Sequence, residues 1–184
     1  MANLIAKTDQ SQLVIIDVQT RLCNTMQEVD MQAVTKNCSN LVQAARMLEV
    51  PVIVTEQYPE GLGETMPEIA QYIGNVQPIA KTAFSAYAVP KFKMQLQRDK
   101  SQIILVGLEA HICVLQTAFD LINQGKQVFV VEDAVISRDP DNKRNAIARL
   151  VAAGCIVTNT ESVVFEWLGN ANHTVFKDVS KLIK

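Results

Sequence analysis

Paired cysteines, basic runs and long apolar runs are all missing from this sequence, and each absence excludes a class of protein. The chain has no CxxC pair, and no histidine lies near a cysteine at zinc-finger spacing. Its cysteines stand far apart, at Cys23, Cys38, Cys113 and Cys155. We therefore expect no disulfides, and a reducing cytoplasm as the location.

The charge balance argues against a nucleic-acid partner. Lysine and arginine number 17 and aspartate and glutamate 19, for a net charge of −2. The segment richest in basic residues, 91–100, mixes them with Asp99. The longest apolar runs fall far below the roughly 18 residues of a membrane helix, and the apolar stretch near Met1 is too short for a signal peptide. We expect neither a nucleic-acid nor a membrane partner.

The size and composition are typical of one globular unit. A chain of 184 residues suits a single α/β domain over 1–184. Hydrophobic residues make up 48% and charged residues 20%. This composition permits a sizeable core, so we expect a folded chain and not a disordered one.

Short β-branched apolar runs alternate along the chain with amphipathic segments. Strands are expected at 13–16, 51–55, 76–80, 103–106, 127–132 and 155–158. Helices are expected at 30–48, 90–98, 114–122, 140–153, 160–168 and 175–182, with a short one opening at 65–68 and a loop over 56–63. Pro78 makes the third strand an edge or irregular strand. The alternation predicts the α/β class: a three-layer α/β/α, doubly wound, mostly parallel six-stranded sheet.

Several helix boundaries are expected from capping residues. Asp30 and Asp139 are candidate N-caps, the latter followed by a proline at the first helical position. Thr65 and Glu68 fit a capping box. Gly154 is expected to end the helix that begins after Asp139.

Three oddly placed reactive or charged residues, Asp17, Lys81 and Cys113, stand at the ends of expected strands. Doubly wound sheets place their sites at the carboxyl ends of strands, so the topology can bring the three together. Cys113 lies between a strand and a helix, where unsatisfied N–H groups favour the thiolate. Lys81 is the single charged residue between Glu68 and Lys91. We predict Cys113 as a nucleophile, with Asp17 and Lys81 paired beside it.

The remaining cysteines and histidines offer weaker candidates. Cys38 lies on the apolar stripe of its helix and Cys155 opens a strand, so both are expected in the core. Cys23 is expected near the site. His111 is a rival base for the thiol or a pocket residue.

Cofactor signals are absent. The two histidines are too far apart for a histidine-rich metal site, and Gly61-Leu-Gly63 lacks the third glycine of a dinucleotide fingerprint. No phosphate-binding loop occurs either, so we expect no metal and no cofactor.

Around the three strand-end residues the sequence resembles the isochorismatase-like cysteine hydrolase superfamily, which has a Rossmann-type fold. The segments that carry the resemblance are Leu13-Val-Ile-Ile-Asp17-Val-Gln19, Ile79-Ala-Lys81-Thr-Ala-Phe-Ser and Gly107-Leu-Glu-Ala-His-Ile-Cys113-Val. Within the superfamily, residues 48–59, 61–63, 109–118 and 176–184 look most like the isochorismatase domain-containing proteins.

The resemblance implies roles for individual residues. Cys113 is then the nucleophile, Asp17 the proton acceptor, and Lys81 the group that tunes both charges. The family also has a non-proline cis peptide before the cysteine, which falls at Leu108–Glu109. The N–H groups of Glu109 and Cys113 are the expected oxyanion donors.

One departure from the family narrows the activity. Nicotinamidases of the superfamily bind a metal through an Asp-x-His pair and a further histidine after the second strand, whereas residues 55–60 here contain no histidine. The expected function is therefore a metal-free cytoplasmic hydrolase. Its substrate would be a small amide, ester-like or enol-ether molecule, attacked to give a covalent thiol intermediate. Candidate pocket residues are Leu22, Tyr58, Phe84 and His111.

Other functions stay open on the same fold. Apolar surface helices and the family's habits suggest a homo-oligomer, and a non-catalytic interaction protein is one alternative. A thiol redox protein, with Cys113 oxidised and Cys23 resolving, is a second. A flavodoxin-like nucleotide-binding module is a third. The sequence identifies neither the substrate nor the symmetry of an oligomer.

Overall fold

The computed structural model describes residues 4–184 and contains a six-stranded parallel sheet. The strands are β1 (Ser11–Ile16), β2 (Val52–Gln57), β3 (Ile79–Lys81), β4 (Gln102–Leu108), β5 (Gln127–Ile136) and β6 (Ile156–Thr158). Their order is β3-β2-β1-β4-β5-β6, and every neighbouring pair is parallel. This confirms the predicted α/β fold, including the edge position of the third strand.

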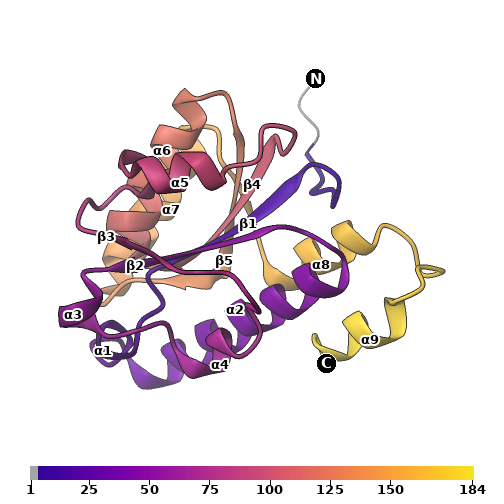
Figure 1. Cartoon of the computed structure of the whole chain (residues 1–184), viewed down its shortest axis with the longest axis horizontal. Coiled ribbons are helices and arrows are strands. Elements are labelled where there is room, and N and C mark those ends of the chain that lie inside the picture. The colour runs from indigo at the N-terminus through magenta and orange to yellow at the C-terminus, as the bar shows by residue number, and fades with distance from the viewer. Residues whose placement is uncertain (1–3) are drawn as a thin grey trace.

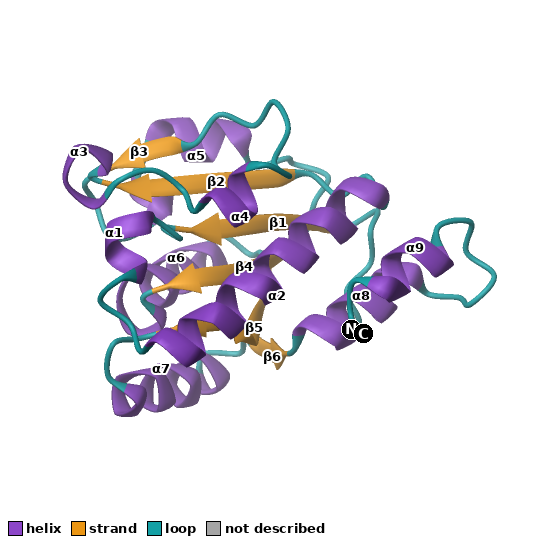
Figure 2. Cartoon of the chain, turned by 90° about the horizontal axis from the view of Figure 1, so that it is seen from below, coloured by secondary structure: helices purple, strands orange, loops and turns teal. Residues whose placement is uncertain are grey.

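Helices cover both faces of the sheet, as Figures 1 and 2 show. One face packs against α2 (Glu28–Met47), α4 (Pro67–Ala70), α8 (Thr160–Leu168) and α9 (Phe176–Lys181). The other packs against α5 (Pro90–Gln95), α6 (Leu115–Asn123) and α7 (Pro140–Ala152). We call these the α2 face and the α6 face.

The alternation of side chains along β1 explains why that strand reads as an unbroken apolar run. Leu13 and Ile15 belong to the core on the α2 face, whereas Val14 and Ile16 belong to the core on the α6 face. All four are fully buried, because helices cover both sides of the strand.

Some short elements were missed or misplaced by the sequence. The loop expected over 56–63 is wrong, since β2 continues to Gln57 and α3 (Pro59–Leu62) follows with a proline at its first position. Helix α1 (Thr20–Cys23) and the 3₁₀ turn η1 (Ala86–Ala88) were not expected. One turn of π-helix, η2 (Ala110–Val114), separates β4 from α6.

Two of the expected capping residues are confirmed. Asp139 caps α7, where its side chain accepts a hydrogen bond from the N–H of Asp141 at 2.8 Å. Gly154 follows the end of that helix with a φ of 91°, the left-handed conformation that glycine adopts without strain.

The other two capping predictions are wrong. Helix α2 begins at Glu28, so Asp30 lies within its first turn. Its negative charge there still interacts favourably with the positive end of the helix dipole. Thr65 donates both its N–H and its hydroxyl to the buried carboxylate of Glu56, at 2.7 Å each, instead of capping α4. A buried carboxylate needs donors, and this need outweighs the local capping preference.

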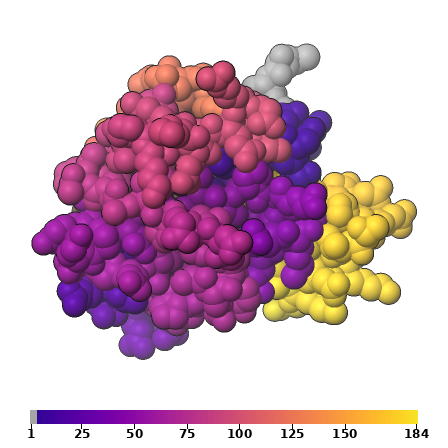
Figure 3. All heavy atoms as spheres, in the orientation of Figure 1, coloured from indigo at the N-terminus to yellow at the C-terminus, as the bar shows by residue number. Residues whose placement is uncertain are grey.

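The C-terminal helix α9 lies at the opposite side of the molecule from α3, as the yellow atoms in Figure 3 show. Across residues 4–184, no helix combines the length and the apolar character needed to cross a membrane.

Gly107 allows β1 and β4 to approach closely at the centre of the sheet. Its φ is 114°, and a Cβ placed there would lie 2.0 Å from the carbonyl oxygen of Ile16. The register between β4 and β5 shifts between Leu105 and Gly107, so the second half of β4 pairs with a later part of β5. Gly107 therefore sets the geometry of the strand that leads to Cys113.

We expect Gly107→Ala to lower the free energy of unfolding by about 2–4 kcal/mol, because backbone clash adds to the strain of its positive φ. Gly125→Ala is the matched control, since Gly125 also has a positive φ of 76° but has nothing within 4 Å of the added Cβ. The control should lose about 1–2 kcal/mol. Urea unfolding of both variants measures the difference, and equal losses would contradict a clash at Gly107.

Candidate active site

The carboxyl ends of β1 and β4 lie side by side at the point where the strand order reverses. The chain moves outward from β1 through β2 to β3, then returns to place β4 on the other side of β1. In Figure 2 the arrowheads of these strands point toward the edge that carries α1 and α3. Asp17 follows β1, Lys81 ends β3, and Cys113 follows β4 within η2. This is where open α/β sheets bind ligands.

Asp17 and Lys81 form an ion pair that is closed off from solvent. Lys81 Nζ lies 2.6 Å from Asp17 Oδ2, and the exposed fraction of both side chains is 0%. The ammonium also donates to Gln57 Oε1 at 2.7 Å, and to the carbonyl oxygens of Ala83 and Phe84 at 3.2 Å each. The two charges therefore form the pair that the sequence predicted.

Strand β2 fixes the second oxygen of the Asp17 carboxylate. Thr55 donates its hydroxyl to Asp17 Oδ1 at 2.6 Å, and its carbonyl oxygen accepts the N–H of Asp17 at 3.1 Å. Asp17 has a φ of 52°, a left-handed conformation that aspartate tolerates better than most side chains. The strand therefore ends in a turn that holds the carboxylate by both backbone and side chain.

Cys113 presents its thiol to this pair from η2. Its residue exposure is 6%, and Asp17 and Lys81 are the charged groups that act on its thiol. Asp17, Lys81 and Cys113 are therefore assembled in one place, although they come from three separate strand ends.

The thiol of Cys113 is protonated at neutral pH. Its pKa is raised to about 12, chiefly by burial and also by the negative charge of Asp17, while the positive charge of Lys81 acts in the opposite direction. The strand-to-helix position alone does not bring this pKa below its ordinary value. Burial penalises the anion more than the nearby N–H groups stabilise it.

The segment between β4 and Cys113 is tied to the loop after β5. The Leu108–Glu109 peptide bond is cis, at the position where the family resemblance places such a bond. Glu109 Oε2 accepts hydrogen bonds from Arg138 N at 2.9 Å and Arg138 Nε at 3.2 Å. Its side chain thus anchors the neighbouring loop.

The candidate pocket residues lie in different surroundings. Tyr58 is 55% exposed and lines a hollow of about 410 Å³ beside β3. Phe84 is 54% exposed, and Leu22 packs against the core on the α2 face. His111, the rival base, has its Nδ1 2.9 Å from Ser137 Oγ.

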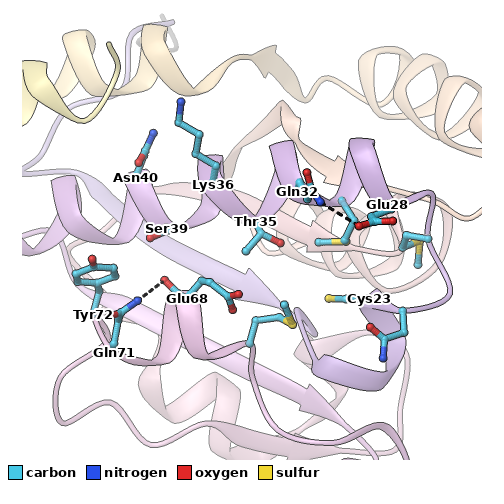
Figure 4. A pocket seen from close by; sticks show the side chains of 14 residues that line it. Cys23, Glu28, Gln32, Thr35, Lys36, Ser39, Asn40, Glu68, Gln71 and Tyr72 are labelled. Carbon is cyan, nitrogen blue, oxygen red and sulfur yellow. Dashed lines mark hydrogen bonds between the residues drawn. The ribbon is translucent and has the colours of Figure 1, made fainter.

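A hollow of about 620 Å³, which Cys113 does not line, lies between α2 and α4 (Figure 4). Cys23 lies at one end of it and belongs to the core on the α2 face, whereas Cys113 belongs to the core on the α6 face. Cys23 therefore lies on the opposite face of the sheet from Cys113. Cys38 and Cys155 are buried, as predicted, and all four cysteines are free.

Sequence reasoning missed Thr55 and Gln57, which contact the ion pair directly. Both are neutral polar residues at the end of β2, and the sheet order places that strand between β1 and β3. Their position on a strand next to Asp17 was the available signal.

No group of three or more histidine, cysteine, aspartate or glutamate side chains suited to hold a metal ion occurs within residues 4–184.

Comparison with known proteins identifies the family to which this chain belongs. A model of the isochorismatase domain matches residues 11–162. Isochorismatase domain-containing protein 2 of Danio rerio is 36% identical over 177 residues, which cover 96% of this chain and 88% of that protein. The Homo sapiens protein of the same name is 38% identical over 146 residues, covering 79% and 70%.

Solved structures agree with the sequence relatives. A Caenorhabditis elegans structure described as a MAR1 ribonuclease is 37% identical and superposes with a TM-score of 0.92, covering 97% of this chain and 92% of that one. The predicted resemblance is confirmed by these matches. The chain belongs to the isochorismatase family.

Proposed function

We propose that this protein is a hydrolase that attacks a small amide, ester-like or enol-ether substrate with Cys113 and forms a covalent thiol intermediate. The observation that carries the proposal is the closed Asp17–Lys81 pair, whose charges act on the nearly buried thiol of Cys113. The family, which is generally hydrolytic, supports the reaction class.

The cost of burying charge favours catalysis over a purely structural role. Taking a carboxylate and an ammonium out of water costs several kcal/mol per ion, and well-packed apolar side chains often serve stability equally well. Groups with perturbed pKa values at the carboxyl end of a sheet are typical of active sites. This argues against the alternative of a non-catalytic interaction protein.

Since the resting thiol is protonated, proton transfer accompanies the attack. For an acyl substrate, Asp17 takes the thiol proton as the Cys113 sulfur bonds to the carbonyl carbon. The N–H groups of Glu109 and Cys113 donate hydrogen bonds to the carbonyl oxygen as negative charge develops on it. Asp17 then protonates the leaving group, and a thioester remains.

Water completes the reaction. Asp17 takes a proton from the water that attacks the thioester carbon, the carbon–sulfur bond breaks, and the proton returns to the thiol. Lys81 keeps its ammonium beside both anions throughout, which stabilises the thiolate relative to the thiol in each half of the cycle.

A redox function through Cys23 and Cys113 has less support. The two residues pack into the cores on opposite faces of the sheet, so a disulfide between them requires one to cross a buried strand layer.

RNA is a substrate class suggested by the name of the Caenorhabditis elegans structure. Affinity for RNA depends on clustered positive charge, whereas this chain has a net charge of −2 and its basic segment 91–100 includes Asp99. We therefore propose a small molecule in preference to RNA.

We also propose a homo-oligomer in solution, because large apolar side chains of Tyr58, Phe84 and Met94 are exposed in the single chain. Sedimentation that gives the mass of a single chain at micromolar concentration would contradict this.

Cys113→Ala should reduce hydrolysis of p-nitrophenyl acetate, a small activated ester, by about 100-fold or more while leaving thermal unfolding close to that of the parent. Cys155→Ala is the matched control, since Cys155 is a buried thiol in the same core. Mass spectrometry should find the acetyl adduct on Cys113 alone. Full turnover by Cys113→Ala would end the covalent mechanism, and cleavage of single-stranded RNA that requires Cys113 would replace the substrate class.

The ionisation of Cys113 gives a second test. With a pKa of about 12, its alkylation by iodoacetamide should still accelerate with pH above 9, where an ordinary thiol levels off. Asp17→Asn removes a charge that raises this pKa and should speed alkylation at pH 9, whereas Lys81→Met should slow it. Simple loosening of the fold would speed both variants, so that result would contradict the electrostatic assignment.

A further inference from the structure

The acceptors around Lys81 account for all the protons of its ammonium. The group has three N–H donors. Asp17 and Gln57 accept the two short bonds, at 2.6 and 2.7 Å, while the carbonyl oxygens of Ala83 and Phe84 share the longer ones at 3.2 Å. Gln57 is thus the second short-range partner of a buried cation.

Hydrogen bonds on all sides fix the side chain of Gln57. Its Nε2 donates to the carbonyl oxygen of Thr82 at 2.8 Å, which leaves Oε1 to face Lys81. Its backbone N–H donates to Gln19 Oε1 at 2.7 Å, and its carbonyl oxygen accepts from Gln19 Nε2 at 3.0 Å. Because Gln19 is fully buried, the last residue of β2 cannot rotate freely.

The neutrality of Gln57 matters to the site. A glutamate in its place would accept the same proton but would add a second negative charge beside Lys81. The positive charge that stabilises a Cys113 thiolate would then be offset, because charges at short range in a buried site are weakly screened. A neutral acceptor orients the ammonium without this loss.

We propose that Gln57 is a positioning residue, which holds the Lys81 ammonium beside Asp17 and Cys113 without adding a second negative charge to the site. The inference rests on the proposed function of Cys113 as the nucleophile. Nothing in it requires that Gln57 touch the substrate.

Few charged groups besides this pair surround the thiol. Asp17 and Lys81 are the charges that act on Cys113. Glu109, on the segment after β4, is paired with Arg138, and His111, in η2, faces Ser137. A change in the ionisation of Cys113 on substitution of Gln57 therefore reports on Lys81.

The experiment measures the rate at which iodoacetamide alkylates Cys113 at pH 9, followed by mass spectrometry of the peptide that contains it. Gln57→Glu should be about tenfold slower than the parent, because the added carboxylate disfavours the thiolate. Gln57→Met removes the acceptor without adding charge. It should also be slower, by less than Gln57→Glu, because Lys81 is no longer held beside the thiolate whose formation it favours. Gln77→Glu, an exposed position before β3, should stay within about twofold of the parent.

The direction of the change in the two Gln57 variants separates positioning from structural support, since both should be slower than the parent. Loosened packing would expose the thiol and speed both variants, which would overturn the proposal. Equal rates for Gln57→Glu and Gln77→Glu would overturn it as well. If Gln57→Glu proves unfolded in a thermal scan, Gln57→Met decides alone, and a faster or unchanged rate refutes the role. Alkylation needs no substrate, so failure here is distinct from failure of the hydrolysis test.

Discussion

A carboxylate and an ammonium lie 2.6 Å apart with no exposure to solvent, and the surrounding structure satisfies both. Thr55 donates to the free oxygen of Asp17, and three further oxygens accept from Lys81. Buried charges persist only where such partners exist, because each unmet bond would cost about 1–3 kcal/mol or more. The carboxyl ends of β1, β2 and β3 are thereby held together as a unit, against which Cys113 packs.

This arrangement keeps the Cys113 thiol protonated at rest and, in the proposed reaction, supports its ionisation. Burial and Asp17 raise the pKa of Cys113 to about 12, so the resting group is protonated and a poor nucleophile. In the proposed reaction Asp17 accepts its proton, and the positive charge of Lys81 favours the anion that forms. Reactivity then depends on a substrate that replaces the missing solvation, rather than on a standing thiolate.

The sequence predicted the fold and the three strand-end residues because periodicity and charge placement are local signals. β1 reads as an apolar run since both its faces are covered, and Lys81 stands out in an otherwise uncharged stretch. Thr55 and Gln57 escaped notice because neutral polar side chains at a strand end carry no such signal. The ionisation of Cys113 and the failed cap at Thr65 depended on burial depth and on Glu56, which are properties of the tertiary structure.

The reversal of strand order between β1 and β4 separates the reacting groups from the segments that shape their surroundings. Asp17, Lys81 and Cys113 belong to the ends of sheet strands or the turns directly after them, whereas α1, α3 and η1 lie in the connections that follow. Under the proposed function, insertions or substitutions in those connections would alter which molecules enter without disturbing the chemistry. With such a division, one scaffold can acquire different substrates through sequence changes in its connecting segments, while the sheet itself stays the same.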